Sequence, residues 1–252
     1  MHPLIYMPHS LLISDLHLCA KQPHCTQLFL HFMQHTAPKA EALYVLGDLF
    51  ESWAGDDELD DPFHQQITRA LSTLAASGTQ LFIMHGNRDF LMAEKWAAAC
   101  HATLLPDPAL VSLYGTPTLL THGDTLCTDD TAYQGYRSQV HEPAWQQQFL
   151  NQPLAQRKAF IEQLRMRSEN EKPHKSSNLM DVNDTAVSSL LRKHNYPRLI
   201  HGHTHRPQRH QHEVDSHICE RWVLGGWDNN ANALCCNSYG CEYLTVTLPV
   251  MP

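Results

Sequence analysis

The chain has 252 residues, of which 42% are hydrophobic and 17% are charged, and its formal net charge is -8. This composition is typical of a globular protein of one domain, or one domain with an insertion, that can bury a sizeable core. Because duplex nucleic acid is bound through basic surfaces, the acidic balance argues against a nuclease, and we expect no nucleic-acid partner.

Strand and helix signals alternate along the chain. Tyr114-Gly115-Thr116 is a hairpin signal, and Asn183 or Asp184 can cap a helix that follows. The alternation predicts an α/β fold in which strands and helices form a layered sandwich. We expect strands at 11–13, 42–46, 80–84, 108–113, 117–121, 199–200, 221–224 and 242–247, and helices at 24–36, 62–76, 90–100 and 184–194.

Five short polar motifs occur in one order, most of them directly after an expected strand. Loops at strand ends bring distant residues together, so the five motifs can supply ligands for two metal ions. Taken alone, each motif is ordinary: His203 and His205 would be a surface chelating pair, and His122 a loop histidine. Their joint order indicates a shared site. The motifs are Asp15-x-His17, Gly47-Asp48, Gly86-Asn87-Arg88-Asp89, Thr121-His122-Gly123-Asp124 and Gly202-His203-Thr204-His205.

The residue types favour a particular kind of metal. Carboxylate oxygen and imidazole nitrogen suit Mn, Fe or Zn better than Ca or a purely thiolate site would. Asp15 and His17, two positions apart at a strand end, are expected to point the same way because side-chain direction alternates. Asp48, which follows the small Gly47, is the candidate to bridge two ions, which in such hydrolases lie about 3.5–4 Å apart.

The pattern changes between residues 129 and 180, where β signals are few and Gln, Arg and Lys are frequent. We expect a helical cap inserted at 129–180 into a core formed by 1–128 and 181–252. Residues 157–175 carry six basic and three acidic side chains. The apolar and basic residues either form the insertion's own core and solvated face, or provide an acyl groove and a basic wall for an anionic substrate.

The cysteines and the N-terminal sequence indicate where in the cell the protein is expected. The 8 Cys include no C-x-x-C pair, so neither a disulfide framework nor a zinc knuckle is expected. Pro3, Pro8, His9 and Asp15 interrupt any apolar leader, and no 18-residue apolar run exists. We expect a cytoplasmic protein whose contact with a membrane is peripheral.

The ordered motifs resemble those of the calcineurin-like metallophosphoesterases, whose pattern is D-x-H, G-D, G-N-H-[DE], H and G-H-x-H. The resemblance covers Asp15 to His205. Longer stretches resemble a narrower family, the UDP-2,3-diacylglucosamine hydrolases of lipid A biosynthesis. These stretches are SDLHL at 14–18, LGDLFESWAGDD at 46–57, HGNRDFLM at 85–92, THGDTLCTDD at 121–130, MDVN at 180–183 and HGHTHRP at 201–207.

This resemblance implies a β-sandwich flanked by helices, with a helical cap that binds acyl chains. It implies two Mn²⁺ ions, one held by Asp15, His17, Asp48 and His205 and the other by Asp48, Asn87, His122 and His203. It implies catalytic roles for Asn87, Arg88 and His122. Substrate contacts would come from Asn87, Arg88, Asp130, Ser168, Lys172, Lys175 and His203, with Lys172 a departure because the family usually has Asn there.

The implied reaction is hydrolysis of UDP-2,3-diacylglucosamine to UMP and 2,3-diacylglucosamine 1-phosphate, by water attack on the uridine-side phosphorus. The implied location is the cytoplasmic face of the inner membrane, where the basic cap would rest on an anionic surface. No protein partner is inferred.

Arg88 is the informative departure from the wider superfamily, which mostly has His at this position. Arginine stays protonated in proteins and cannot be a general acid, but its fork can hold phosphate charge. A phosphate leaving group, with a pKa of about 6, needs little protonation, so Arg88 favours a diphosphate substrate. The alternative is a structural Arg88 paired with Asp89.

Two other functions stay open at this point. The chain could be a two-metal phosphoesterase acting on soluble nucleotides or phosphoproteins, which a comparison of substrates would reveal. It could also be a metal-binding scaffold with a retired site, although all the expected ligands are present.

Overall fold

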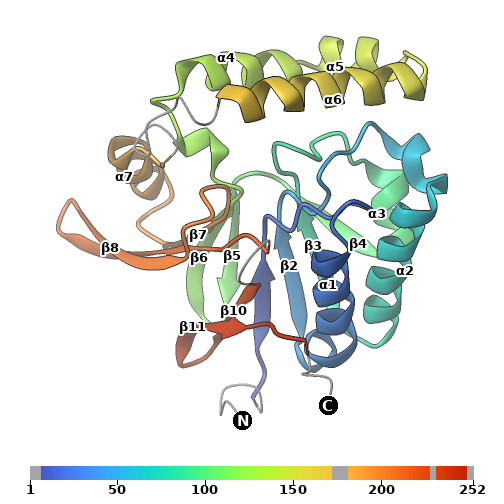
Figure 1. Cartoon of the computed structure of the whole chain (residues 1–252). Coiled ribbons are helices and arrows are strands. Elements are labelled where there is room, and N and C mark those ends of the chain that lie inside the picture. The colour runs from blue at the N-terminus through green and yellow to red at the C-terminus, as the bar shows by residue number, and fades with distance from the viewer. Residues whose placement is uncertain (1–6, 172–180, 228–230, 249–252) are drawn as a thin grey trace.

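Two β-sheets pack face to face and form the centre of the molecule (Figure 1). The computed structural model describes residues 7–171, 181–227 and 231–248, so Lys172 and Lys175 lie outside the described residues. The first sheet has the order β11-β10-β1-β2-β3-β4. Its strands are β1 (Ser10–Ile13), β2 (Ala42–Leu46), β3 (Gln80–Met84), β4 (Ala102–Leu105), β10 (Asn232–Asn237) and β11 (Gly240–Thr245).

The second sheet has the order β5-β6-β7-β9-β8, and β6, β7 and β9 run parallel to one another. The expected hairpin joins β5 to β6: Tyr114 and Gly115 have φ of 52° and 84°, the positive values that a tight two-residue turn requires at both positions. The strands are β5 (Ala109–Leu113), β6 (Thr116–Thr121), β7 (Arg198–His201), β8 (Gln208–Val214) and β9 (His217–Val223).

Alternate residues of the central strands face two different cores. On β1, Leu11 and Ile13 pack toward the helices, whereas Leu12 packs between the two sheets. The same alternation holds on β2, where Val45 faces the helices and Tyr44 the second sheet. Both faces are buried, which explains why these strands are continuous apolar runs rather than alternating ones.

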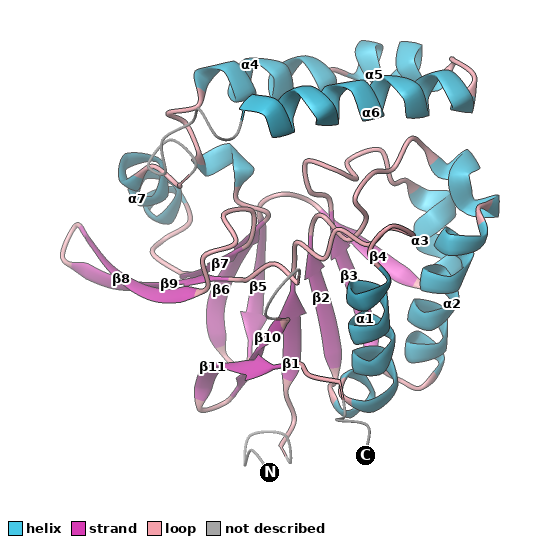
Figure 2. Ribbon diagram, viewed as in Figure 1, coloured by secondary structure: helices cyan, strands magenta, loops and turns pink. Residues whose placement is uncertain are grey.

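Helices cover the outer faces of both sheets (Figure 2). Against the first sheet lie α1 (Pro23–His35), α2 (Pro62–Ala76) and α3 (Glu94–Cys100), and against the second lies α7 (Asp184–Lys193). Asn183 caps α7 by accepting from the Thr185 and Ala186 amides, as expected. Short 3-10 turns are η2 (Ala37–Lys39), η3 (Asp56–Asp60) and η4 (Asp124–Leu126).

The helix expected at 90–100 begins later than predicted, at Glu94. Its cap is a side chain from another loop: Asp56 accepts from the amides of Ala93 and Trp96. Three strands were not predicted at all, namely β4, β8 and β10. β8 in particular is an edge strand with the polar sequence Gln-Arg-His-Gln-His-Glu, so it lacks the apolar alternation that marks a strand.

Three further helices lie above the carboxyl ends of the parallel strands (Figure 1). They are α4 (Thr131–Val140), α5 (Pro143–Leu150) and α6 (Leu154–Glu171), here called the cap. They fall in the region expected to be an insertion, whose boundaries stay a prediction. Within the described part of the chain, no helix is both long enough and apolar enough to cross a bilayer.

Basic side chains of α6 tie the cap to the core. Arg157 is only 2% exposed; it donates to the Ala54 carbonyl and pairs with Asp57. Lys158 Nζ lies 2.6 Å from Glu58 Oε1, and Arg165 contacts Glu51. Local sequence could not predict these three contacts, because it does not reveal the acidic partners that face the basic residues.

Gly55 lies next to Arg157, and we expect Gly55→Ala to weaken the contact between Arg157 and the core. A Cβ there would lie 2.5 Å from Arg157 Nη1 and 2.8 Å from Leu150 Cδ2. Gly78→Ala is the matched control: it also has positive φ, +107° against +131°, but nothing lies within 4 Å of its added Cβ. By chemical denaturation, Gly55→Ala should cost about 1–3 kcal/mol more than Gly78→Ala; equal costs would mean that only backbone strain matters.

Among the described residues, Cys236 and Cys241 form a disulfide. The two residues are direct partners across β10 and β11. Their proximity arises from strand register, which cysteine spacing in the sequence does not reveal.

Candidate metal centre

The polar motifs converge because five strands end at the same edge of the sandwich. Asp15 and His17 follow β1, Asp48 follows β2, and Asn87 follows β3. The remaining motifs follow two adjacent parallel strands of the second sheet, with His122 after β6 and the pair His203 and His205 after β7. Carboxyl ends of parallel strands are the usual position of ligand sites in α/β folds.

Left-handed backbone conformations cluster in these loops. Asp15, His17, Asp48, His203 and His205 have φ between 49° and 67°, a region that few residues other than glycine adopt. β1 ends at Ile13, so Asp15 and His17 do not converge through strand alternation, and that reason for their shared direction was wrong. Strained backbone of this kind is typical of functional sites, where the surrounding structure maintains it.

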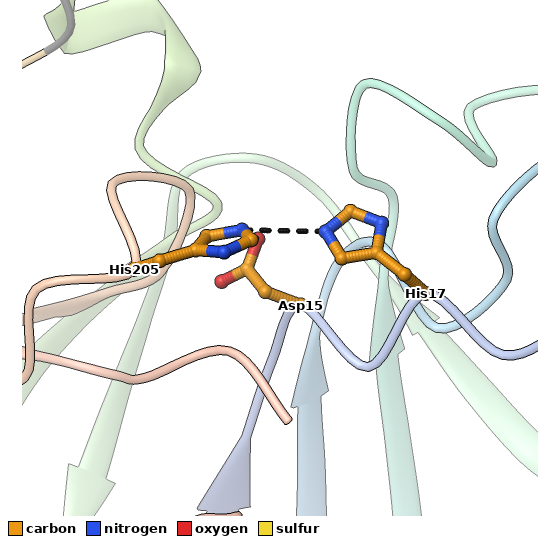
Figure 3. A group of neighbouring side chains, drawn as sticks. All are labelled: Asp15, His17 and His205. Atoms are coloured by element: carbon orange, nitrogen blue, oxygen red, sulfur yellow. Dashed lines mark hydrogen bonds and ion pairs between the residues drawn. The ribbon is translucent and has the colours of Figure 1, made fainter. Parts of the chain in front are cut away.

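Asp15, His17 and His205 form one group of ligand atoms within 4.8 Å of one another. The Nε2 atoms of His17 and His205 are 3.2 Å apart, and His205 Nε2 lies 3.4 Å from Asp15 Oδ1 (Figure 3). Asp15 is fully buried, yet its Oδ1 accepts no hydrogen bond from the described residues. A buried carboxylate oxygen without a donor, facing two imidazole nitrogens, fits a divalent cation.

Asp48 lies between this group and a second one. Its Oδ2 is 3.9 Å from His17 Nε2, and its Oδ1 is 3.9 Å from His122 Nε2. Asp15, Asp48 and His122 form the second group of ligand atoms within 4.8 Å. A Cβ on Gly86 would lie 2.1 Å from Asp48 Oδ1, so the glycine leaves room for the carboxylate that faces both sides.

Asn87 brings the last ligands together. Its Oδ1 lies 3.0 Å from His122 Nε2 and 3.0 Å from His203 Nδ1. All seven residues expected to bind metal are therefore neighbours, arranged on two sides of Asp48. The donor set fits a dinuclear site for divalent ions.

Hydrogen bonds from outside the ligand set hold these side chains. His122 Nδ1 lies 2.9 Å from the Leu46 carbonyl, which leaves Nε2 directed at the site. Buried Asp89 accepts from the amides of Leu49 and Gly86, and so fixes two of the loops. Its carboxylate is used in this way, so the alternative in which Arg88 is a structural partner of Asp89 is not supported.

Burial and neighbouring charge shift the pKa values in opposite directions. Burial alone would raise the pKa of Asp15, but the nearby imidazoles of His205, His122 and His17 hold it well below its usual range. Burial lowers the pKa of His203 to about 4 and lowers that of His17. His122 differs: Asp48, Asp15 and Asp124 outweigh its burial and raise its pKa to about 9.

The shift at His122 predicts how metal affinity depends on pH. A metal ligand must be the neutral imidazole, and a ring whose pKa is about 9 is protonated at neutral pH. The proton competes with the metal, so apparent affinity should rise by about tenfold per pH unit up to about pH 9. Calorimetry in buffers of different ionisation enthalpy would detect the released proton; an affinity that is flat between pH 7 and 9 would contradict the expectation.

A cavity of about 740 Å³ adjoins the metal-ligand residues. It is lined by His17, Asp48, Asn87 and His203, and also by Arg88, by Asp130 just before α4, and by Ser168 of the cap. Asp130 has a second role, since it caps α4 by accepting from the Tyr133 amide. The cavity's apolar lining comes from core and cap together: Trp53, Phe90, Trp145, Phe149, Ile161 and Leu164.

Sequence reasoning missed several residues that support the site. Tyr133 stacks on His203 and donates to Asp124, which Arg137 also binds through Nε at 2.7 Å. Asp124 is the last residue of the motif Thr121-His122-Gly123-Asp124, and its position two residues after His122 is the signal that could have identified it. Glu51, 3.0 Å from His17 Nδ1, carried no signal of its own.

Two sheets flanked by helices, with paired Asp and His ligands at the strand ends, define a metal-dependent phosphoesterase. The chain belongs to the calcineurin-like phosphoesterase family, whose model matches residues 9–207.

Within that family, the chain is similar to several curated proteins of one name. Curated proteins called UDP-2,3-diacylglucosamine hydrolase match it from Aromatoleum aromaticum, at 53% identity over 88% of this chain and 90% of theirs. Others are from Edwardsiella ictaluri, at 43% over 96% and 93%, and Escherichia coli O81, at 46% over 86% and 90%.

Proposed function

We propose that the chain is a metal-dependent diphosphatase that hydrolyses UDP-2,3-diacylglucosamine to UMP and 2,3-diacylglucosamine 1-phosphate. One observation carries the proposal: a single cavity joins the metal-ligand residues to an apolar wall made by the core and the cap. Relatives of similar length that carry the name of this activity support it.

The lining of the cavity fits two parts of such a substrate, the diphosphate and the acyl chains. In the proposed complex, Arg88 and the ligand histidines would face the diphosphate, and aromatic lining residues such as Trp145 and Phe149 would provide apolar area for acyl chains. Sites for small molecules commonly combine an apolar wall with a few polar groups. A soluble nucleotide would leave the apolar wall exposed to water.

The two cations held by the seven ligands would lower the pKa of a water molecule and offset the phosphate charge. We propose Mn²⁺ for both ions, a choice that the Asp, Asn and His ligands permit. The protein's own residues hold the geometry: buried Asp89 fixes the β2 and β3 loops, and the Leu46 carbonyl fixes the ring of His122.

Arg88 stabilises charge in this mechanism and moves no proton. Its backbone amide donates to Asp48 Oδ1 at 2.8 Å, while its side chain lines the cavity beside Asn87. The guanidinium fork can bind the phosphate that leaves as 2,3-diacylglucosamine 1-phosphate. Attack at the uridine-side phosphorus leaves that phosphate intact.

A comparison of substrates tests the proposal. We expect turnover of acylated UDP-glucosamine and little of UDP-glucose or p-nitrophenyl phosphate, with metal content measured on the same sample. In H₂¹⁸O, the label should enter UMP and not the sugar phosphate. Comparable rates on all three substrates would instead identify a phosphoesterase for soluble substrates, and label in the sugar phosphate would reverse the site of attack.

We also propose that the cap rests on an anionic membrane surface, at the cytoplasmic face of the inner membrane. Support comes from exposed apolar side chains on the cap, with Phe160 at 40% and Met166 at 57% exposure. Sedimentation with anionic vesicles should show less binding for Met166→Asp than for wild type. Equal binding of the two proteins would rule out this face.

A further inference from the structure

Glu51 contacts both a metal-ligand residue and the cap. Its Oε2 lies 3.0 Å from His17 Nδ1. Its other carboxylate oxygen pairs with Arg165 of α6, and its backbone carbonyl accepts a second contact from the same guanidinium. Arg88 Nη1 is farther away, at 4.0 Å. One arginine of the cap therefore holds both the side chain and the backbone of Glu51.

The position of Glu51 behind His17 has a chemical consequence. His17 directs Nε2 toward Asp48 and His205, so Nδ1 is the nitrogen that points away from the ligand cluster. Imidazoles that bind metals commonly present this second nitrogen to a carboxylate, which sets the tautomer and orientation of the ring. The separation of Nδ1 and Oε2 is that of a hydrogen bond, without the linear geometry of a fully formed one.

The other ion pairs that α6 makes with the same loop do not reach the ligands. Lys158 pairs with Glu58, whose second oxygen accepts from the Ala54 amide. Arg157 pairs with Asp57, whose side chain is half exposed. Among the described ion pairs between α6 and the core, only that of Arg165 leads directly to a metal-ligand residue.

We propose that Glu51 is a positioning residue that links the docking of α6 to the orientation of His17, so that metal binding and cap docking stabilise each other. The inference rests on the proposed function only in treating the cap as a wall of the substrate cavity. The cluster of ligand side chains and the contact between Glu51 and the cap are observed directly in the geometry. The test therefore uses Mn²⁺ alone.

Two explanations of the role of Arg165 predict opposite effects of Arg165→Met on Mn²⁺ affinity. Removing a cationic side chain near a site for cations should raise Mn²⁺ affinity if only electrostatics matters. If Arg165 acts by holding Glu51, affinity should fall. Lys158→Met is the matched control, since it removes the same charge from the same helix while leaving Glu51 in place.

Calorimetric titration with Mn²⁺ gives the first readout. We expect Glu51→Gln to lower affinity by roughly 10–100-fold, as loss of a partner behind a ligand histidine does, and Arg165→Met to lower it severalfold. Lys158→Met should bind as wild type does. The double variant Glu51→Gln/Arg165→Met should bind no more weakly than Glu51→Gln, because the two residues act through one contact.

Hydrogen exchange of α6 gives a readout that a merely structural role would not move. Coupling is reciprocal, so Mn²⁺ should slow exchange in α6 of the wild type and of Lys158→Met, and the slowing should disappear in Glu51→Gln. Arg165→Met binding as tightly as Lys158→Met, or α6 protection that persists in Glu51→Gln, would overturn the inference. Loss of turnover on the lipid substrate with intact coupling would overturn only the proposed function.

Discussion

Asp48→Asn is expected to abolish metal binding and turnover together. Asp48 is 2% exposed, and its two oxygens face His17 on one side and His122 on the other. The amide keeps the shape of the side chain but removes the charge that two cations would share. We expect metal affinity to fall by more than the roughly 100-fold that loss of an outer partner of a ligand costs.

Thermal stability separates loss of a ligand from misfolding in this variant. Burial raises the pKa of Asp48. At a pH above the pKa that this carboxyl has in the unfolded chain, its ionised form therefore lowers the stability of the folded state. Removing that charge should leave the stability of metal-stripped protein unchanged or higher at neutral pH. The rise in Tm that added Mn²⁺ gives the wild type should be absent.

Asp56→Asn provides the control, because Asp56 caps α3 and lies outside the ligand set. It should lower Tm by weakening that cap while leaving the Mn²⁺ stoichiometry intact. Full turnover by Asp48→Asn at ordinary metal concentration would exclude a shared carboxylate and with it the two-metal centre.

The ligands could be predicted from the sequence because each motif is local and its strand is strongly apolar. The end of β2 at Leu46, for example, is visible in the run Ala42–Leu46, and Asp48 follows it directly. The residue types then indicate the kind of site, because Asp, Asn and His side chains gathered at five strand ends are typical of metal binding. The order of the strands and motifs is sufficient to identify these ligands, and the exact packing of the strands is not required.

Long-range partners could not be predicted in the same way. Arg157, Lys158 and Arg165 form a basic cluster in the sequence, but acidic residues about 100 positions earlier meet them in the fold. The disulfide depends likewise on the register of β10 and β11, and the direction of Asp15 on a backbone of positive φ. Each of these features follows from tertiary structure, which periodicity does not encode.

Arg88 offers a test of the chemistry that leaves the metal centre in place. Its link to the bridging Asp48 is through the backbone amide, which every substitution except proline retains. Its side chain lines the cavity and lies 4.0 Å from the nearest oxygen of Glu51. Replacing the side chain should therefore alter catalysis without removing a ligand.

We expect Arg88→Ala to lower kcat by roughly 100- to 1,000-fold, about 3 kcal/mol, which is typical for loss of one preorganised charge-stabilising donor. Mn²⁺ affinity and stoichiometry should stay close to wild type. Arg88→Lys should recover only part of the rate, because a point charge lacks the bidentate fork.

Arg88→His distinguishes two mechanisms. A rate equal to wild type or higher would show that a proton donor can replace Arg88 and that the leaving group requires protonation. A rate near that of Arg88→Ala would show that the leaving phosphate is stabilised by charge, as the cavity beside Arg88 implies.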